Sequence, residues 1–176
     1  MPRIRGRLSV AAMFSVGALA LSATSSAQAS GCHGAGANAA SASASKLRAA
    51  VLCLVNKQRR AHGVGALRAN KRLAKAAGRH ARDMRAHNYF DHQRPGGPDL
   101  TARLARAGWS GHAWGENLAY ECGPVATPRV TVRSWMHSPP HRSIMLSSTY
   151  RQAGVGVTNR APCGAGGMWV LDVGRQ

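Results

Sequence analysis

The chain has 176 residues, with 24 lysines and arginines against 6 aspartates and glutamates, and its formal net charge is +18. This length suits one domain with a core of its own that needs no metal for stability. So few carboxylates argue against a glycosidase, which needs a pair of them at its active site. The charge predicts an attraction to anionic polymers that weakens with salt, although an arginine-rich genome explains it equally well.

The first segment has the three parts of a secretory signal peptide. Arginines at positions 3, 5 and 7 precede an apolar run over residues 8–21, and Ala27-Gln28-Ala29 is a small-x-small cleavage site. No segment reaches the roughly 20 apolar residues of a membrane helix. We therefore expect removal of residues 1–29 and an extracellular mature protein without a membrane span. An uncleaved membrane anchor is the alternative.

Export makes disulfides the expected state of the four cysteines, because no cytosolic reductant holds them as thiols. The chain has no Cys-x-x-Cys pair, which argues against a zinc site built on cysteine. Four cysteines allow three pairings, of which we favour Cys32–Cys53 together with Cys122–Cys163. Each bridge should stabilise the folded state by about 3 to 4 kcal/mol, because it lowers the conformational entropy of the unfolded chain.

The first part of the mature chain, residues 30–45, is rich in Gly, Ala and Ser and is expected to be a linker with little to bury apart from Cys32. From residue 46 the pattern becomes helical, with Ser45 as the expected N-cap. The apolar residues of this helix recur on one face: Leu47, Val51, Leu54 and Val55.

A second helix is expected from its cap at Asn70 to about His87. His80 falls near the apolar stripe of this helix, so we expect a buried, hydrogen-bonded core histidine rather than a ligand. The stripe itself consists of Leu73, Ala77, Ala81 and Met84.

Two further helices are marked by their ends. Asp99 caps a short helix over residues 99–107, which Gly108 stops. After an extended stretch over residues 109–120, Thr127 caps a helix that begins at Pro128 and ends before Pro139. His141 then lies in a new, short turn of helix.

The C-terminal part, residues 152–158 and 167–174, alternates like two paired strands. Apolar residues occupy both faces of the last strand, so both faces should be covered. Gly154 and Gly156 leave room for a helix backbone to approach the other strand closely. Helices on both sides of a small, mainly antiparallel sheet satisfy these demands.

Four short motifs in a fixed order resemble those of the CAP superfamily, also termed SCP-like. They are residues 88–92 (NYFDH), 115–119 (GENLA), 135–146 (WMHSPPHRSIML) and 154–157 (GVGV). The resemblance extends from about Leu47 to Gly174. It implies an α+β fold, a three-layer α-β-α sandwich, over a CAP domain that covers residues 46–176.

The resemblance also implies a cleft, because members of the family line one with two histidines and two acids, and in several the histidines hold zinc or a related divalent ion. His92, Glu116 and His141 match three of these positions, whereas Ser138 stands where the second acid is expected. We expect a binding cleft lined by His92, Glu116, Asn117, Ser138 and His141. Two histidines are fewer ligands than catalytic zinc sites use, so we expect a weak, pH-sensitive metal site at His92 and His141 and no required cofactor.

The sequence favours a binding protein over an enzyme, since it has no metalloprotease, nucleophile-elbow, phosphate-loop or dinucleotide motif. The resemblance implies a lipid, sterol or protein ligand. The main alternative is a metal-assisted extracellular hydrolase of peptide or cell-wall material, with Glu116 as its base. A third view is a basic domain that adheres to anionic wall polymers. We expect a monomer without a nucleic-acid partner.

Overall fold

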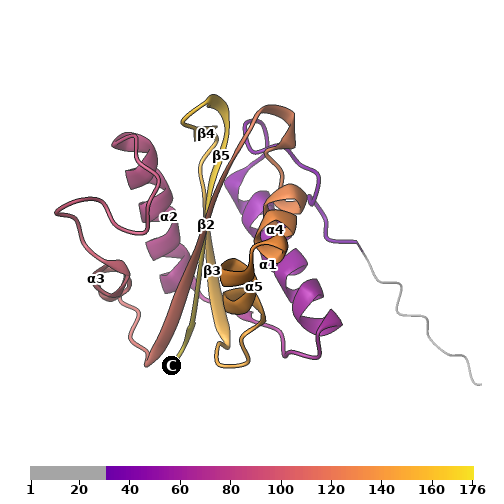
Figure 1. Ribbon diagram of the computed structural model, residues 1–176, viewed down its shortest axis with the longest axis vertical. Helices are drawn as coiled ribbons and strands as arrows, with labels where there is room; N and C mark the ends of the chain where they lie inside the picture. Colours follow the sequence, from indigo (N-terminus) through magenta and orange to yellow (C-terminus); the bar gives the residue numbers. More distant parts are fainter. Residues whose placement is uncertain (1–30) are drawn as a thin grey trace, which may run out of the picture.

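Two layers of helices enclose a β-sheet in the computed structural model, which describes residues 31–176 (Figure 1). The expected signal peptide therefore lies outside the described residues. The α+β sandwich predicted from the sequence is confirmed. The helices are α1 (Ala44–Ala61), α2 (Lys71–Ala86), α3 (Leu100–Arg106), α4 (Pro128–His137) and α5 (Pro139–Leu146), and a 3₁₀ turn, η1, covers Gly123–Val125. The strands are β1 (Arg68–Ala69), β2 (Ala113–Cys122), β3 (Gln152–Val157), β4 (Arg160–Ala161) and β5 (Gly164–Arg175).

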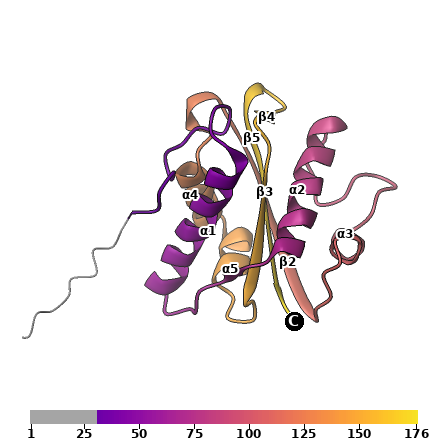
Figure 2. The same ribbon diagram turned by 180° about the vertical axis from the view of Figure 1, so that it is seen from behind.

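The sheet has the strand order β1-β3-β5-β2, and β4 pairs with β5 beside this path. Only β1 and β3 run parallel, so the sheet is mainly antiparallel, as expected. Figures 1 and 2 show α1, α4 and α5 on one face and α2 and α3 on the other. The long strand β2 lies at an edge of the sheet, which decides where the candidate site is formed.

The helix ends follow the predicted capping residues with one exception. Asn70, Asp99 and Thr127 accept hydrogen bonds from backbone N–H groups in the first turns of α2, α3 and α4. The exception is α1, which begins at Ala44 with Ser43 as its cap rather than Ser45. Several serines precede this helix, and each is an acceptable cap by local chemistry.

The larger core lies between the sheet and the layer of α1, α4 and α5. Trp169, Leu171 and Val173 of β5 are fully buried there, and the indole N–H of Trp135 donates to the Leu118 carbonyl over 2.9 Å. Met168 and Val170 are also fully buried, on the opposite face of β5. Both faces of β5 are therefore covered, as its sequence predicted.

The backbone of α2 lies directly on β3. A β-carbon at Gly154 would collide with the backbone of Leu73 and Ala74, and one at Gly156 with that of Ala77. The two glycines thus allow the close approach that the sequence indicated, and this contact fixes α2 against the sheet.

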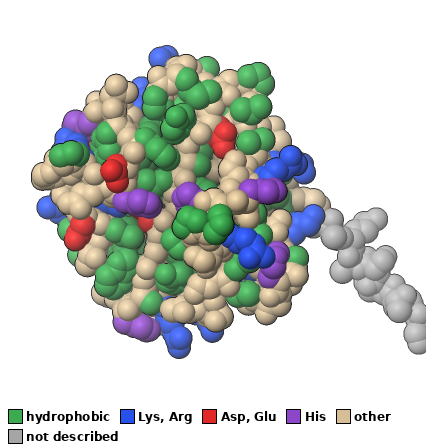
Figure 3. All heavy atoms as spheres, in the orientation of Figure 1, with side chains coloured by type: hydrophobic (Ala, Val, Ile, Leu, Met, Phe, Trp, Pro, Cys, Tyr) green, Lys and Arg blue, Asp and Glu red, His purple; other side chains and the backbone are tan. Residues whose placement is uncertain are grey.

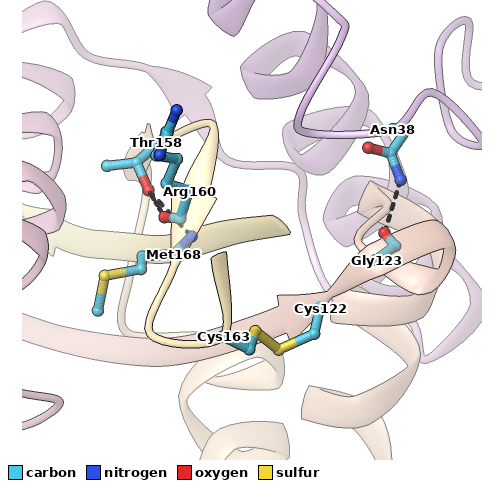
Figure 4. The surroundings of a disulfide bond; sticks show 7 residues. All are labelled: Asn38, Cys122, Gly123, Thr158, Arg160, Cys163 and Met168. Atoms are coloured by element: carbon cyan, nitrogen blue, oxygen red, sulfur yellow. Dashed lines mark hydrogen bonds between the residues drawn. A yellow bond between two sulfur atoms is a disulfide. The ribbon is translucent and has the colours of Figure 1, made fainter. Parts of the chain in front are cut away.

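Both disulfides of the favoured pairing are present. Cys32–Cys53 ties the first described residues to α1, and Cys122–Cys163 joins the end of β2 to the turn between β4 and β5 (Figure 4).

Residues 31–43, the described part of the expected linker before α1, lie against the domain. Ala39 is fully buried, and the Asn38 amide donates to the Gly123 carbonyl over 2.8 Å. Within residues 31–176, no helix has the length and apolar character needed to cross a membrane.

Candidate functional site

The candidate site is built on two neighbouring residues of the edge strand β2. Glu116 and Asn117 are both buried, and they point to opposite faces of the sheet because side chains alternate along a strand. Glu116 contacts Arg103 of α3, whereas Asn117 contacts His141 of α5. The predicted cleft residues therefore do not line one face of the sheet but are divided between its two sides.

On the α2 and α3 side, Glu116 accepts hydrogen bonds from two residues. The guanidinium of Arg103 donates to both carboxylate oxygens, over 2.8 and 3.0 Å. The Nδ1 atom of His92 lies 2.8 Å from Oε1 of the same carboxylate. Both oxygens of Glu116 are thus engaged, and the carboxylate holds the His92 ring in a fixed orientation.

This network shifts the pKa values of its members. Burial alone would raise the pKa of Glu116, but the hydrogen bonds from His92 and Arg103 and the charge of Arg103 outweigh burial and lower it to about 2. The hydrogen bond to Glu116 raises the pKa of His92, against the opposing effect of burial. The pair is therefore an ionised carboxylate beside a histidine that readily takes a proton.

The loop that carries His92 is fastened at three points. The ring of Phe90 packs edge-on against Tyr120 of β2, with 5.0 Å between centroids. The buried ring of His80 in α2 bonds to the Asp91 carbonyl through Nε2 over 3.0 Å, and Arg103 donates to the carbonyl of His92 itself over 2.8 Å. His80 is thus the hydrogen-bonded core histidine expected from the sequence, and burial lowers its pKa.

A second carboxyl group, that of Asp172 in β5, lies beside Glu116. The two residues are direct partners in the β2–β5 ladder, and Asp172 is completely buried. No donor among the described residues bonds to either of its side-chain oxygens, whereas its protonated form is hydrogen-bonded to Glu116. Burial and then the charge of Glu116 raise the pKa of Asp172 well above its ordinary value, so Asp172 keeps its proton while Glu116 is ionised.

On the opposite side, His141 is held by its own helix and by β2. Its Nδ1 atom lies 2.7 Å from the hydroxyl of Ser138, the residue that caps α5. Its carbonyl accepts from the Asn117 amide over 2.9 Å. Burial and then the charge of His92 lower the pKa of His141, so the two rings interact electrostatically across the edge of the sheet.

The structure thus forms two linked pairs, His92 with Glu116 and Ser138 with His141, and Asn117 joins the second pair to β2. Figure 3 shows several histidine side chains at the surface on the side of the molecule that faces the viewer in Figure 1. Prolines at the first two positions of α5 separate His141 from His137 of α4, as the sequence predicted.

The two histidines offer two ring nitrogens, fewer than the three protein ligands of catalytic zinc sites. Both histidines are bonded through Nδ1, which leaves each Nε2 as the ring nitrogen for a metal, an arrangement typical of histidine ligands. Glu116 is already engaged by Arg103, and Ser138 supplies a hydroxyl in place of a carboxylate. Within residues 31–176, no group of three or more His, Cys, Asp or Glu side chains is arranged to hold a metal.

Sequence reasoning missed Arg103, which is bonded to Glu116, and Asp172, whose carboxyl group lies beside that of Glu116. Each interrupts an apolar pattern: Arg103 lies on the same helical face as Leu100, Leu104 and Ala107, and Asp172 occupies the centre of a buried strand. A charge on a buried face predicts a partner, but the sequence does not show which one.

The chain belongs to the CAP family. The family model described as "Cysteine-rich secretory protein family" matches residues 52–173. The resemblance seen in the sequence motifs is thereby confirmed.

Two curated relatives come from Bacillus subtilis. The uncharacterized membrane protein YlbC is 35% identical over 112 residues, which cover 62% of this chain and 31% of the relative. The uncharacterized protein YkwD is 34% identical over 106 residues, which cover 60% of this chain and 40% of the relative. The chain thus spans about a third of the length of these relatives.

Solved structures share the fold. An extracellular protein containing an SCP domain from Bacillus anthracis has a TM-score of 0.68 and 25% identity, and the match covers 76% of this chain and 41% of that one. An outer surface protein of Borrelia burgdorferi has a TM-score of 0.62 and 17% identity, with coverage of 72% and 90%.

Proposed function

We propose that the protein is an extracellular CAP-domain binding protein that recognises its ligand through the Nε2 atoms of His92 and His141. One observation carries this proposal: both rings are bonded through Nδ1, to Glu116 and to Ser138. A ring fixed at one nitrogen presents the other to a ligand in a defined direction. The His92 side chain is also 56% exposed, so its outer edge is accessible.

The location outside the cell is supported by three observations. The sequence begins with the parts of a signal peptide, both cysteine pairs form disulfides, and the similar Bacillus anthracis protein is described as extracellular. Association with the cell wall fits the net charge of +15 (21 minus 6) that remains without the three arginines of the expected signal peptide, because wall polymers are often anionic. A lipid, a sterol or a protein remains the proposed ligand class.

A divalent cation such as zinc would bind at His92 and His141, with solvent or ligand atoms completing its coordination. Two nitrogens without a protein carboxylate give a weaker site than the three ligands of catalytic zinc enzymes. A bound ion would act as a bridge to a ligand with an oxygen or nitrogen donor.

The alternative, a metal-assisted hydrolase, requires Glu116 as a general base. The Glu116 side chain is 1% exposed, both of its oxygens are engaged and its pKa is about 2, so it is a poor proton acceptor near neutral pH. These features favour binding over turnover.

Zinc titration by calorimetry tests the two-histidine site. We expect weak, saturable binding that is lost in His92→Gln and in His141→Gln. The control is His137→Gln, which removes an exposed histidine whose Nδ1 bonds to its own helix at the Arg133 carbonyl. Zinc binding that survives both site substitutions would remove the metal part of the proposal.

A hydrolysis screen against peptides and peptidoglycan separates the binder from the enzyme, since we expect no turnover with or without zinc. Turnover that disappears in His92→Gln would favour the hydrolase.

Native mass spectrometry of the protein secreted by its own host should show a bound lipid, sterol or protein in the wild type and less of it in His92→Gln and His141→Gln. Material that carries nothing would contradict the binding proposal.

A further inference from the structure

A second candidate site lies on the α2 and α3 side of the molecule, where four arginines surround a cavity of about 330 Å³. We name it the arginine pocket. It lies between α2, α3 and the loop that joins them, the layer seen on the left in Figure 1 and on the right in Figure 2. Its lining residues are Ala76, Arg79, His80, Asp83, Arg94, Pro98, Arg103 and Arg106.

The arginines come from three different elements and are held in part by other residues. Arg79 of α2 donates to the carbonyl of Arg106 in α3 over 3.3 Å, which connects the two helices across the pocket. Arg94, in the loop, lies 4.0 Å from the Asp83 carboxylate. The positive groups therefore surround the cavity on several sides instead of forming one exposed row.

Positive charge exceeds negative charge in this pocket. Arg103 is neutralised by Glu116, and the only carboxylate in the lining is that of Asp83, which also accepts from the Tyr89 hydroxyl over 2.6 Å and lies 3.0 Å from His87. Among residues 31–176, no carboxylate lies within 4.0 Å of Arg79 or Arg106. Two guanidiniums thus remain uncompensated beside the cavity.

Most residues of the lining are charged or polar, although the aliphatic stems of the arginines also face the cavity. Ala76 and Pro98 are its only apolar residues, and a volume near 330 Å³ lies at the lower end of the range for small-molecule sites. An oxyanion matches the uncompensated charge. A planar carboxylate is satisfied by a single guanidinium fork, whereas a tetrahedral phosphate accepts from donors that arrive from several directions.

We propose that the arginine pocket binds a phosphate group, with Arg79, Arg94 and Arg106 as its donors, and that this phosphate belongs to a poly(glycerol phosphate)-type anionic polymer. A polymer of this class repeats the same group, so weak individual contacts add up along the chain. The net charge, +15 (21 minus 6) without the three arginines of the expected signal peptide, attracts such a polymer over a longer range. Arg103 supplies neither net charge nor a free Nη donor, because Glu116 neutralises it and its Nη atoms already bond to Glu116 and to the His92 carbonyl.

The test compares two double variants that remove equal charge from opposite layers. Arg79→Gln with Arg106→Gln removes the uncompensated donors, whereas Arg48→Gln with Arg60→Gln removes two exposed arginines of α1. Glycerol phosphate, inorganic phosphate and poly(glycerol phosphate) are titrated into each by calorimetry at several salt concentrations. We expect the pocket variant to lose about tenfold or more in affinity, and the α1 variant much less, because only the pocket variant loses charged hydrogen bonds to the phosphate.

Equal losses in the two double variants would overturn the proposal, since they would mean a diffuse attraction to the whole surface. Absence of binding to all three probes would overturn it as well. If the polymer binds much more tightly per phosphate group than free phosphate does, the polymer is supported as the ligand. If the two affinities are equal, the pocket is still a phosphate site, but its ligand is free phosphate and not the polymer. The Arg79→Gln, Arg106→Gln variant keeps His92 and His141 and should bind zinc like the wild type, so the phosphate test and the zinc titration can fail independently.

Discussion

The two faces of the sheet are stabilised in different ways. Toward α1, α4 and α5 the contact is made by large apolar side chains such as Trp135, Trp169 and Leu171. Toward α2 and α3 the helix backbone lies directly on glycines, and the buried space beside it contains Glu116 and Asp172. The buried carboxyl groups therefore lie where the packing is less apolar, and the charge of Glu116 affects the pKa of Asp172.

Two buried arginines, one on each side of the sheet, show the same difference between the two faces. Arg59, on the apolar side, is fully buried and donates only to backbone carbonyls, those of Gly65, Met145, Ser147 and Tyr150. It fastens the segment after α5 to α1 and so supports the position of His141. Arg103, on the other side, is bonded to a carboxylate that holds a histidine. The first is a structural cross-link, and the second also sets the charge of the site.

Loss of Arg103 should produce the largest effect. Arg103→Met leaves the buried Glu116 without its cationic partner, and such a loss costs about 3 to 5 kcal/mol in the free energy of unfolding. Urea unfolding followed by tryptophan fluorescence measures this cost. Combining Arg103→Met with Glu116→Leu should recover most of it, because the uncompensated charge is then gone. A double variant no more stable than the single one would show that the ion pair is not the cause.

The next effect should appear in the pH dependence of stability. Asp172 retains its proton in the folded state above its ordinary pKa of 3.8, whereas the unfolded chain releases it. Stability therefore falls as pH rises above 3.8, by about 1.4 kcal/mol for each pH unit until the folded pKa is reached. Asp172→Asn should remove this decline and gain stability toward neutral pH.

Unfolding in urea between about pH 4 and about pH 7 measures the slope for the wild type and for Asp172→Asn. Asp91→Asn serves as a control, because Asp91 is an exposed acid in the loop beside the same site. Parallel pH profiles for the wild type and Asp172→Asn would mean that Asp172 is ionised in the folded protein.

A smaller effect is expected from backbone packing on the α2 face. Gly156→Ala introduces a methyl group into the space occupied by the Ala77 carbonyl, which should cost about 1 to 3 kcal/mol in urea unfolding. Gly65→Ala is the matched control, since nothing lies within 4 Å of its added methyl group. Equal stability of the two variants would mean that α2 can move away from the sheet without cost.

Local chemistry predicted most of the fold. Several features depend only on residues that are neighbours in the sequence. They are the caps at Asn70, Asp99 and Thr127, the prolines that begin α4 and α5, and the apolar alternation of β5. The start of α1 was placed wrongly because several serines offer the same capping chemistry. Burial of Ala39 depends on a hydrogen bond to Ala126, far along the chain, which no local pattern reveals.

The site was predictable only in part, for the same reason. The motifs indicated His92, Glu116 and His141, and the structure bonds the first two directly. The division of Glu116 and Asn117 between two faces follows from strand alternation once β2 is known to be an edge strand, which the sequence does not state. The partners Arg103 and Asp172 come from other elements, so only the tertiary structure identifies them.

The smallest effect should come from His92, the other partner of Glu116. His92→Ala removes a hydrogen bond from a side chain that is 56% exposed, so solvent screening should keep the loss below about 1 kcal/mol. The folded pKa of His92 is raised above its ordinary 6.5, so its charged contribution is complete below that pH and disappears as pH rises through the folded pKa. Unfolding in urea should therefore show a larger deficit for His92→Ala at about pH 5.5 than at about pH 9. A deficit as large as that of Arg103→Met would mean that the exposed histidine, rather than the buried arginine, stabilises Glu116.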